Sequence, residues 1–320
     1  MKKIILPAFA LLTFIASAQA PTFVSTTPEN KNVILEEFTG ISCGYCPDGH
    51  LRGQNLHNAN PNDVFLINIH TGTYATPQGP GTDFNTNFGP SLWSQSGGSG
   101  FPAGTMNRRP FPNTGPQANP SGTGQGDCST CTAMSRGYWA GISPIILAEP
   151  SPVNVGIQSS IDMASNTLTV DVEIYYTGSQ TVSTNMLNIA VVQNNVEGPQ
   201  SGSSANPTAV LPNGNYNHQH MLRHLITGQW GEQISNLTTG ALYTNQFTWV
   251  MPNDINGVAL DATNLAVVAF VSEGNQEILS GTEDYPSLVF INSYDANLIN
   301  SSSTDIMCTP TTDLTVDFKN

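Results

Sequence analysis

The feature that most constrains the fold of this chain is a pair of cysteines between a predicted strand and a predicted helix. The run Val33–Phe38 is apolar except for two carboxylates, which is typical of a buried strand. Cys43 and Cys46 follow a short turn, and Pro47 begins a predicted helix that runs to about Ala59. Proline is favoured in a first helical turn because its missing N–H has no helical partner there. The cysteine pair is therefore predicted to lie at a helix N-terminus.

A second apolar strand is predicted at Val64–Ile69, directly after this helix. A strand, a helix and a strand with connections of this length predict a parallel βαβ unit. A cysteine at a helix N-terminus faces free backbone N–H groups and the positive end of the helix dipole, which lower the pKa of its thiol. We expect Cys43 to be the exposed nucleophile and Cys46 the resolving thiol of a disulfide-exchange pair.

Residues Met1–Ala20 have the composition of a secretory signal peptide. Lys2 and Lys3 precede the apolar run Ile4–Ser17, and small residues at Ala18–Ala20 form a cleavage site. Export places the cysteines in an oxidising compartment, where disulfides persist. No later segment approaches the roughly 18 consecutive apolar residues of a membrane helix, so we expect no membrane-spanning segment after signal removal.

The overall charge excludes nucleic acid as an expected partner. The chain has 9 basic and 23 acidic residues, a net charge of −14, and removal of Lys2 and Lys3 gives −14 − 2 = −16. A protein of this charge repels phosphate backbones. Only 10% of its 320 residues are charged, and the rest is rich in Gly, Pro, Asn, Ser and Thr, which favours strands joined by turns over long exposed helices.

The first half resembles the thioredoxin superfamily. Glu37 lies six residues before Cys43, the spacing at which that superfamily carries a buried acid. The resemblance implies that Glu37 accepts the proton of Cys46 during exchange. Gly100–Pro102 resembles the cis-proline loop, which implies that Pro102 lies beside the pair and offers backbone groups to a Cys-containing polypeptide. We expect no cofactor, and the alternative reading is an inert disulfide on an inherited fold.

A second C-x-x-C pair is formed by Cys128 and Cys131. We expect it to close a local disulfide before a helix at Ala133–Ile142, with Asp127 as the N-cap. The alternative is that both C-x-x-C pairs hold a zinc ion, but their separation far exceeds the usual ligand spacing. Cys308 is left without an assigned partner.

The pattern of residue types along the chain changes near residue 150. Several β-branched and aromatic runs follow, separated by turn residues, and together they predict an antiparallel β-sandwich. These runs are Val153–Ile157, Leu168–Tyr176, Leu187–Val192, Gln246–Val250 and Leu265–Val271. We therefore expect a thioredoxin-like α/β domain over residues 21–149 and a β-sandwich domain over 150–297. Residues 298–320 are expected to form a linker and the start of a further β module.

The second half also contains a group of histidines. His218 and His220 would share one face of a strand, where they could ligate a metal. The alternative is that these two and His224 are exposed or hydrogen-bonded within the sheet. No carboxylate or cysteine lies close in sequence, and no metal site is assigned.

Four motifs in order resemble the twenty-eight-kilodalton outer-membrane protein family of Bacteroidetes-type bacteria. They are Glu36–Gly40 before the cysteine pair, Gly100–Arg108, Gly198–Gly202 and His220–Arg223. The resemblance implies a thioredoxin-like domain followed by a β-rich domain, exported to the periplasm, the outer membrane or the cell surface. The leading hypothesis is thiol–disulfide exchange on Cys-containing polypeptides. The alternative is a non-enzymatic surface binding or adhesion protein that captures a surface ligand.

Overall fold

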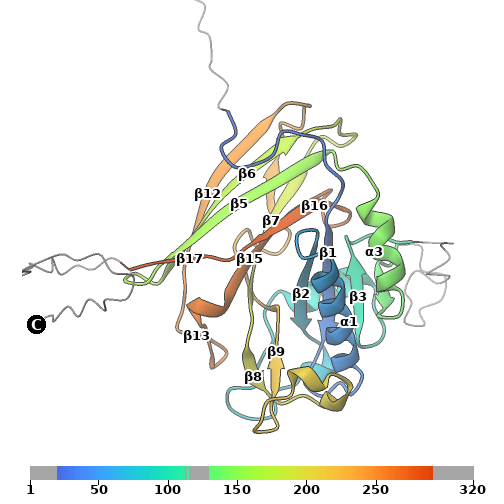
Figure 1. Cartoon of the computed structure of the whole chain (residues 1–320), viewed down its shortest axis with the longest axis vertical. Helices are drawn as coiled ribbons and strands as arrows, with labels where there is room; N and C mark the ends of the chain where they lie inside the picture. Colours follow the sequence, from blue (N-terminus) through green and yellow to red (C-terminus); the bar gives the residue numbers. More distant parts are fainter. Residues whose placement is uncertain (1–19, 112–113, 115–129, 291–320) are drawn as a thin grey trace, which may run out of the picture.

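The computed structural model describes residues 20–111, 114 and 130–290, and its centre is a large mixed sheet (Figure 1). The strand order is β16-β15-β7-β10-β2-β1-β3-β4, and β11 also pairs with β7. In chain order these strands are β1 (Val33–Thr39), β2 (Val64–His70), β3 (Ala103–Met106), β4 (Ala133–Ser135), β7 (Asn185–Gln193), β10 (Met221–Leu225), β11 (Glu232–Ile234), β15 (Leu265–Ser272) and β16 (Ile278–Asp284).

The predicted βαβ unit is present at the start of the sheet. Strands β1 and β2 are parallel, and helix α1 (Cys46–Ala59) connects them. The strand predicted after Pro102 is β3, which pairs antiparallel with β1. The helix predicted at Ala133–Ile142 is partly wrong: the backbone of its first residues pairs with β3 as strand β4, and helix α3 spans Trp139–Leu147.

The two halves of the chain share this sheet. Strand β10 lies parallel to β2, with Met221 opposite Asn68. The backbone N–H of Asn68 donates to the carbonyl of His220 at 2.7 Å, and its side-chain amide donates to the carbonyl of Gln219 at 2.8 Å. Strands from both sides of residue 150 therefore form one continuous sheet, while the predicted domain limits remain a prediction.

The predicted strands of the second half are all present, but they divide between two sheets. The smaller sheet has the order β12-β6-β5-β17. Its apolar side chains form one core with those of β7 and β15 in the large sheet, so the two sheets pack face to face. The strands of this smaller sheet are β5 (Val153–Asp162), β6 (Thr167–Tyr176), β12 (Leu242–Val250) and β17 (Ser287–Val289).

Alternation along the strands assigns the two faces of the large sheet. On β1, Val33 and Leu35 pack with Trp139 of α3, beside which α1 lies (Figure 1). The alternate residues Ile34 and Phe38 belong to another core, which also includes residues of α2 (Gly89–Ser96), β7 and β15. One apolar layer therefore runs beneath both halves of the chain.

A buried ion pair joins β1 to the segment after β3. Arg108 donates from Nε to Oε2 of Glu36 at 2.7 Å and from Nη2 to Oε1 at 2.6 Å. Both side chains are buried, and the guanidinium carbon lies 5.1 Å from the ring centre of Phe270 on β15. Two of the sequence motifs thus meet inside the protein.

The remaining elements are short. They are β8 (Val196–Gly198), β9 (Tyr216–His218), β13 (Asp254–Ile255), β14 (Val258–Ala259) and the 3-10 turns Thr73–Ala75, Ser203–Ala205, Pro207–Ala209 and Ala262–Asn264. Within the described ranges, every helix is too short or too polar to cross a membrane. Residues 1–19 of the signal peptide lie outside the described residues, and only its last residue, Ala20, is described. Cys128, Cys308 and the predicted C-terminal β module also lie outside the described residues.

We predict that Arg108→Met lowers the free energy of unfolding by about 3–5 kcal/mol, because it leaves the charge of Glu36 buried without its partner. Urea unfolding measures the loss, and the double variant Glu36→Gln/Arg108→Met should recover part of it. Arg52→Ala is the control, since Arg52 pairs with Asp48 at the surface and should cost at most about 1 kcal/mol. Equal losses in the two single variants would contradict the prediction.

Candidate redox site

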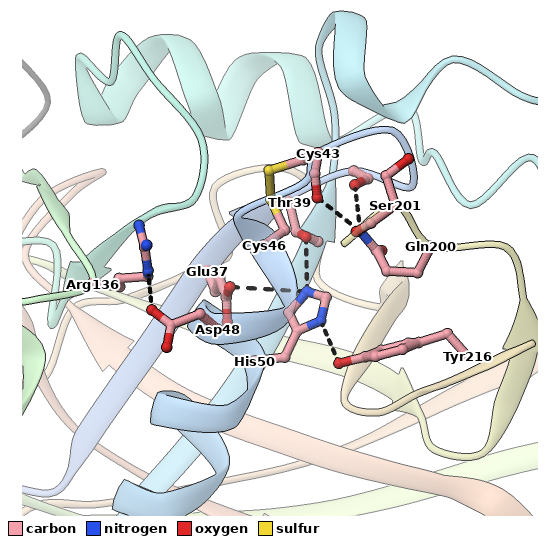
Figure 2. The surroundings of a disulfide bond; sticks show 11 residues. Glu37, Thr39, Cys43, Cys46, Asp48, His50, Arg136, Gln200, Ser201 and Tyr216 are labelled. Atoms are coloured by element: carbon pink, nitrogen blue, oxygen red, sulfur yellow. Dashed lines mark hydrogen bonds and ion pairs between the residues drawn. A yellow bond between two sulfur atoms is a disulfide. The ribbon is translucent and has the colours of Figure 1, made fainter. Parts of the chain in front are cut away.

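The C-x-x-C pair lies where the sequence places it, at the start of α1. Cys43 and Cys46 form a disulfide, and α1 begins at Cys46 with proline in its first turn (Figure 2). The turn after β1 is held by the N–H of Cys43, which donates to the carbonyl of Gly40 at 3.0 Å. The pair therefore faces the N-terminal end of the helix, where free N–H groups stabilise a thiolate.

Glu37 lies buried below the disulfide. Its side chain is 1% exposed, and a Cβ on Gly49 of α1 would collide with its carboxylate and lie 3.0 Å from the ring of Pro102. The Phe101–Pro102 bond is cis, as the sequence predicts. Burial raises the pKa of Glu37 well above its ordinary value, with the nearby charges of Arg136 and Asp48 acting in opposite directions. Glu37 and Pro102 thus meet α1 one turn beyond the disulfide.

The prediction that Cys43 is exposed is wrong. Cys43 is only 2% exposed, because residues Gly198–Gly202, here called the covering segment, lie over its loop. Gln200 of this segment donates from its side-chain amide to the carbonyls of Cys43 at 3.0 Å and Gly40 at 3.3 Å (Figure 2). The N–H of Ser201 donates to the carbonyl of Ile41 at 2.8 Å.

Aromatic side chains are exposed beside the buried disulfide. Tyr45, between the two cysteines, is 71% exposed, and Tyr74 is 45% exposed. The ring of Tyr45 lies under the guanidinium of Arg136, which also pairs with Asp48. The ring of Tyr74 contacts that of Phe101 next to the cis-proline. Two exposed tyrosines and the Arg136–Asp48 ion pair therefore lie at the surface around the disulfide.

His50 is a site residue that the sequence analysis missed. Its Nε2 lies 2.8 Å from Oγ1 of Thr39 and 3.9 Å from Oε1 of Glu37, and its Nδ1 lies 3.1 Å from the hydroxyl of Tyr216 (Figure 2). Burial lowers the pKa of His50 to about 3. Its position four residues after Cys46, on the same helix face, could have indicated it. No sequence signal indicated Tyr216, which comes from the other half of the chain.

The three histidines of the second half do not form a cluster with one another. Strand β9 ends at His218, and His220 has a φ of 50°, so the two do not share a strand face. His218 contacts the rings of His70 and Phe84, whereas His224 stacks on Trp249. Within the described residues, no three His, Cys, Asp or Glu side chains are placed to hold a metal ion.

The alternative reading of these histidines agrees better with the structure. Nε2 of His220 lies 3.1 Å from Oε1 of Gln54, and Nε2 of His218 lies 3.3 Å from the carbonyl of Pro199. Burial lowers the pKa of His218 to about 4 and that of His220 to about 3. Both rings are therefore neutral near pH 7. Cys131 is also buried, and its predicted disulfide with Cys128 remains a prediction.

Comparisons with known proteins give a family and a fold. A sequence profile described as "Outer membrane protein Omp28" matches residues 91–283, more than half of the chain. The solved structure of HBP35 of Porphyromonas gingivalis covers 88% of this chain and 81% of its own length, with 18% identity and a TM-score of 0.59. A domain of the outer membrane lipoprotein Omp28 from the same organism covers 43% of this chain and 90% of its own length, with 15% identity and a TM-score of 0.29. No curated protein matches the chain.

We predict that Gln200→Ala speeds reduction of the Cys43–Cys46 disulfide by dithiothreitol. Loss of two hydrogen bonds of about 1 kcal/mol each should make the covering segment open roughly tenfold or more often. Thiol counting over time measures the rate. Gln246→Ala is the control, because Gln246 binds Asp171 on an exposed strand. A rate equal to that of Gln246→Ala would show that the covering segment does not limit access.

We predict that Glu37→Gln becomes more stable relative to wild type as the pH rises above 4.5, the ordinary pKa of this carboxyl. The native state holds the Glu37 proton to higher pH than the unfolded state does. Wild-type stability therefore declines as the pH rises from the pKa of Glu37 in the unfolded state to its raised pKa in the native state, by up to about 1.4 kcal/mol per pH unit. Urea unfolding between pH 4 and 8 measures this, with the exposed Glu232→Gln as control. A difference from wild type that does not change with pH would contradict the prediction.

Proposed function

Because the chain belongs to the Omp28 outer membrane protein family, and is therefore exported, we propose that its Cys43–Cys46 pair exchanges disulfides with Cys-containing polypeptides outside the cytoplasm. In this proposal the βαβ unit with its cis-proline is a thioredoxin-like domain. The smaller sheet and the β7–β15 part of the large sheet, which share one core, form a sandwich beside it. Export supports the proposal because it supplies the oxidising compartment in which such exchange takes place.

The observation that carries the proposal is that the disulfide, the carboxyl of Glu37 and the ring of Pro102 all lie at the first turns of α1. Gly49 lacks a side chain where the carboxylate of Glu37 and the ring of Pro102 both approach the helix. A structural disulfide needs neither a buried carboxyl nor a proline loop beside it. A buried carboxyl with a raised pKa is, by contrast, a feature of sites that move protons.

The exchange takes place in two steps that conserve atoms and electrons. The thiolate of reduced Cys43 attacks one sulfur of a polypeptide disulfide, and the other sulfur leaves as a thiolate that takes a proton from water. Cys46 then gives its thiol proton to the carboxylate of Glu37 and attacks Sγ of Cys43. The polypeptide leaves as its second thiolate, so it is reduced by two electrons while the Cys43–Cys46 pair is oxidised. The reverse sequence oxidises a polypeptide dithiol.

The aromatic surface supports a polypeptide as the substrate. The exposed rings of Tyr45 and Tyr74 flank the disulfide, and aromatic side chains of this kind carry much of the binding energy in protein interfaces. Pro102 immediately precedes β3, and in this proposal its loop offers backbone groups to an extended chain.

A second candidate function is binding with an inert disulfide. The observation that favours it is the 2% exposure of Cys43 under the covering segment. In that case the pair only fixes the loop on which Tyr45 is presented to a surface ligand. Two results together would favour this function. The full-length Cys43→Ser/Cys46→Ser protein would bind cells or surface polypeptides as wild type does, and wild type would show no disulfide exchange.

We predict that Cys46→Ser accumulates mixed disulfides between Cys43 and polypeptides when it is expressed in the exported form. Without the resolving thiol, the intermediate has no internal route of release. Non-reducing electrophoresis with mass spectrometry identifies these species. Cys43→Ser is the matched control, because it leaves Cys46, the thiol proposed to resolve and not to attack, as the remaining thiol of the pair. Equal amounts of adduct in both variants, or none in either, would overturn the assignment of Cys43 as the nucleophile.

A further inference from the structure

We propose that His50 is a positioning residue that relays protons between Glu37 and a polar surface cavity during disulfide exchange, an inference that rests on the proposed function. Each oxidation or reduction of the pair moves a proton on or off Cys46. Glu37 is buried, so a proton that it takes or gives must also travel to solvent. The structure contains a polar route for this step, formed by both halves of the chain.

The first part of the route is the contact between Glu37 and His50. Within the described part of the chain, Oε1 of Glu37 has no hydrogen-bond partner, and Nε2 of His50 lies 3.9 Å from it. The His50 side chain is itself only 9% exposed. A small movement of the ring brings these two atoms to hydrogen-bonding distance, which is about 2.7–3.0 Å.

The second part is the contact between His50 and Tyr216. The side-chain amide of Asn206 donates to the Tyr216 hydroxyl at 2.9 Å, which leaves that hydroxyl its own proton to donate to Nδ1 of His50. In the disulfide form shown here, this network assigns the ring proton of His50 to Nε2, the nitrogen that faces Glu37 and Thr39. The ring is thus oriented to give a proton to the carboxylate.

The third part is a polar cavity of about 150 Å³ that has both His50 and Tyr216 in its wall. Its other lining residues include Gln54, Asn68 and Asn206, and the exposed Thr208 places the cavity at the surface. A water molecule occupies about 30 Å³ of liquid, so the cavity can hold several. His50 therefore stands between the buried carboxyl and water.

The proton moves by exchange of the two neutral forms of the ring. When the disulfide is reduced, Glu37 gives a proton to the departing Cys46 thiolate and takes one from Nε2. In the same event Nδ1 takes the hydroxyl proton of Tyr216, which a cavity water in exchange with solvent replaces, so that no charged form of the ring arises. Oxidation runs these transfers backwards, so one full cycle restores the starting form. The ring remains neutral throughout, in keeping with the low pKa that burial gives it.

Other titratable groups surround this route. Those that face His50 or Glu37 are His70 on β2, Tyr216 and His218 on β9, Asp48 on α1 and Arg136 after β4. The rings of His70 and His218 are neutral near pH 7 because burial lowers the pKa of each. Asp48 and Arg136 pair with each other. Between pH 6 and 9, the cysteine thiols and Glu37, whose pKa burial raises, are therefore the groups expected to shape the pH profile of exchange, while His50 stays neutral.

The test uses the full chain and two small reagents. The rate of reduction of the pair by dithiothreitol, and of its reoxidation by glutathione disulfide, is measured between pH 6 and 9. His50→Gln keeps a polar side chain but cannot exchange tautomers, and it should slow both steps by about tenfold or more. His57→Gln is the matched control on the same helix, because His57 contacts the carbonyl of Val64 and not Glu37. It should behave as wild type.

Two further measurements separate proton relay from a structural effect. In His50→Ala, imidazole added to the buffer should enter the cavity and restore much of the lost rate, whereas it should not affect His57→Gln. Tyr216→Phe removes only the hydroxyl and should slow both steps without changing the substrate dependence. The inference would be overturned if His50→Gln and Tyr216→Phe reacted as fast as His57→Gln at every pH. It would also be overturned if imidazole left the rate of His50→Ala unchanged. Wild type that reacts with neither reagent would instead overturn the proposed function.

Discussion

Burial of the Glu37 carboxyl under α1 is the interaction on which the rest of the site depends. A carboxyl taken out of water without full hydrogen bonding favours its protonated form, and its pKa is raised accordingly. Its place there requires Gly49 on the helix, since any side chain would collide with it. In the proposed exchange the same burial makes a proton path necessary, and this would give the neutral ring of His50 a chemical reason for its position.

The second half of the chain contributes residues to this site. Strand β10 extends the sheet at β2. The chain that leads into β10 places the covering segment against Cys43 and places Tyr216 against His50. A single apolar layer continues under β1, β2, β7 and β15. Gln200, which contacts the carbonyl of Cys43, and Tyr216, which contacts His50, therefore lie 157 and 166 positions away from these partners in sequence.

The sequence predicts well those features that depend on neighbouring residues. The βαβ unit follows from apolar runs and a proline at the helix start, and the cis bond before Pro102 follows from a motif. The 133–142 helix fails because Ala133–Ser135 pairs with β3, a contact that local propensity does not contain. The burial of Cys43 and the roles of Gln200 and Tyr216 arise from tertiary contacts alone, so no local pattern indicates them.

The most direct test of this account is the reduction potential of the Cys43–Cys46 pair in the full chain. Equilibration with glutathione buffers followed by thiol counting gives the value. We predict a potential between about −120 and −270 mV, the range of proteins that exchange disulfides. A potential below about −300 mV is that of a structural disulfide, and it would contradict the claim that this pair is chemically active.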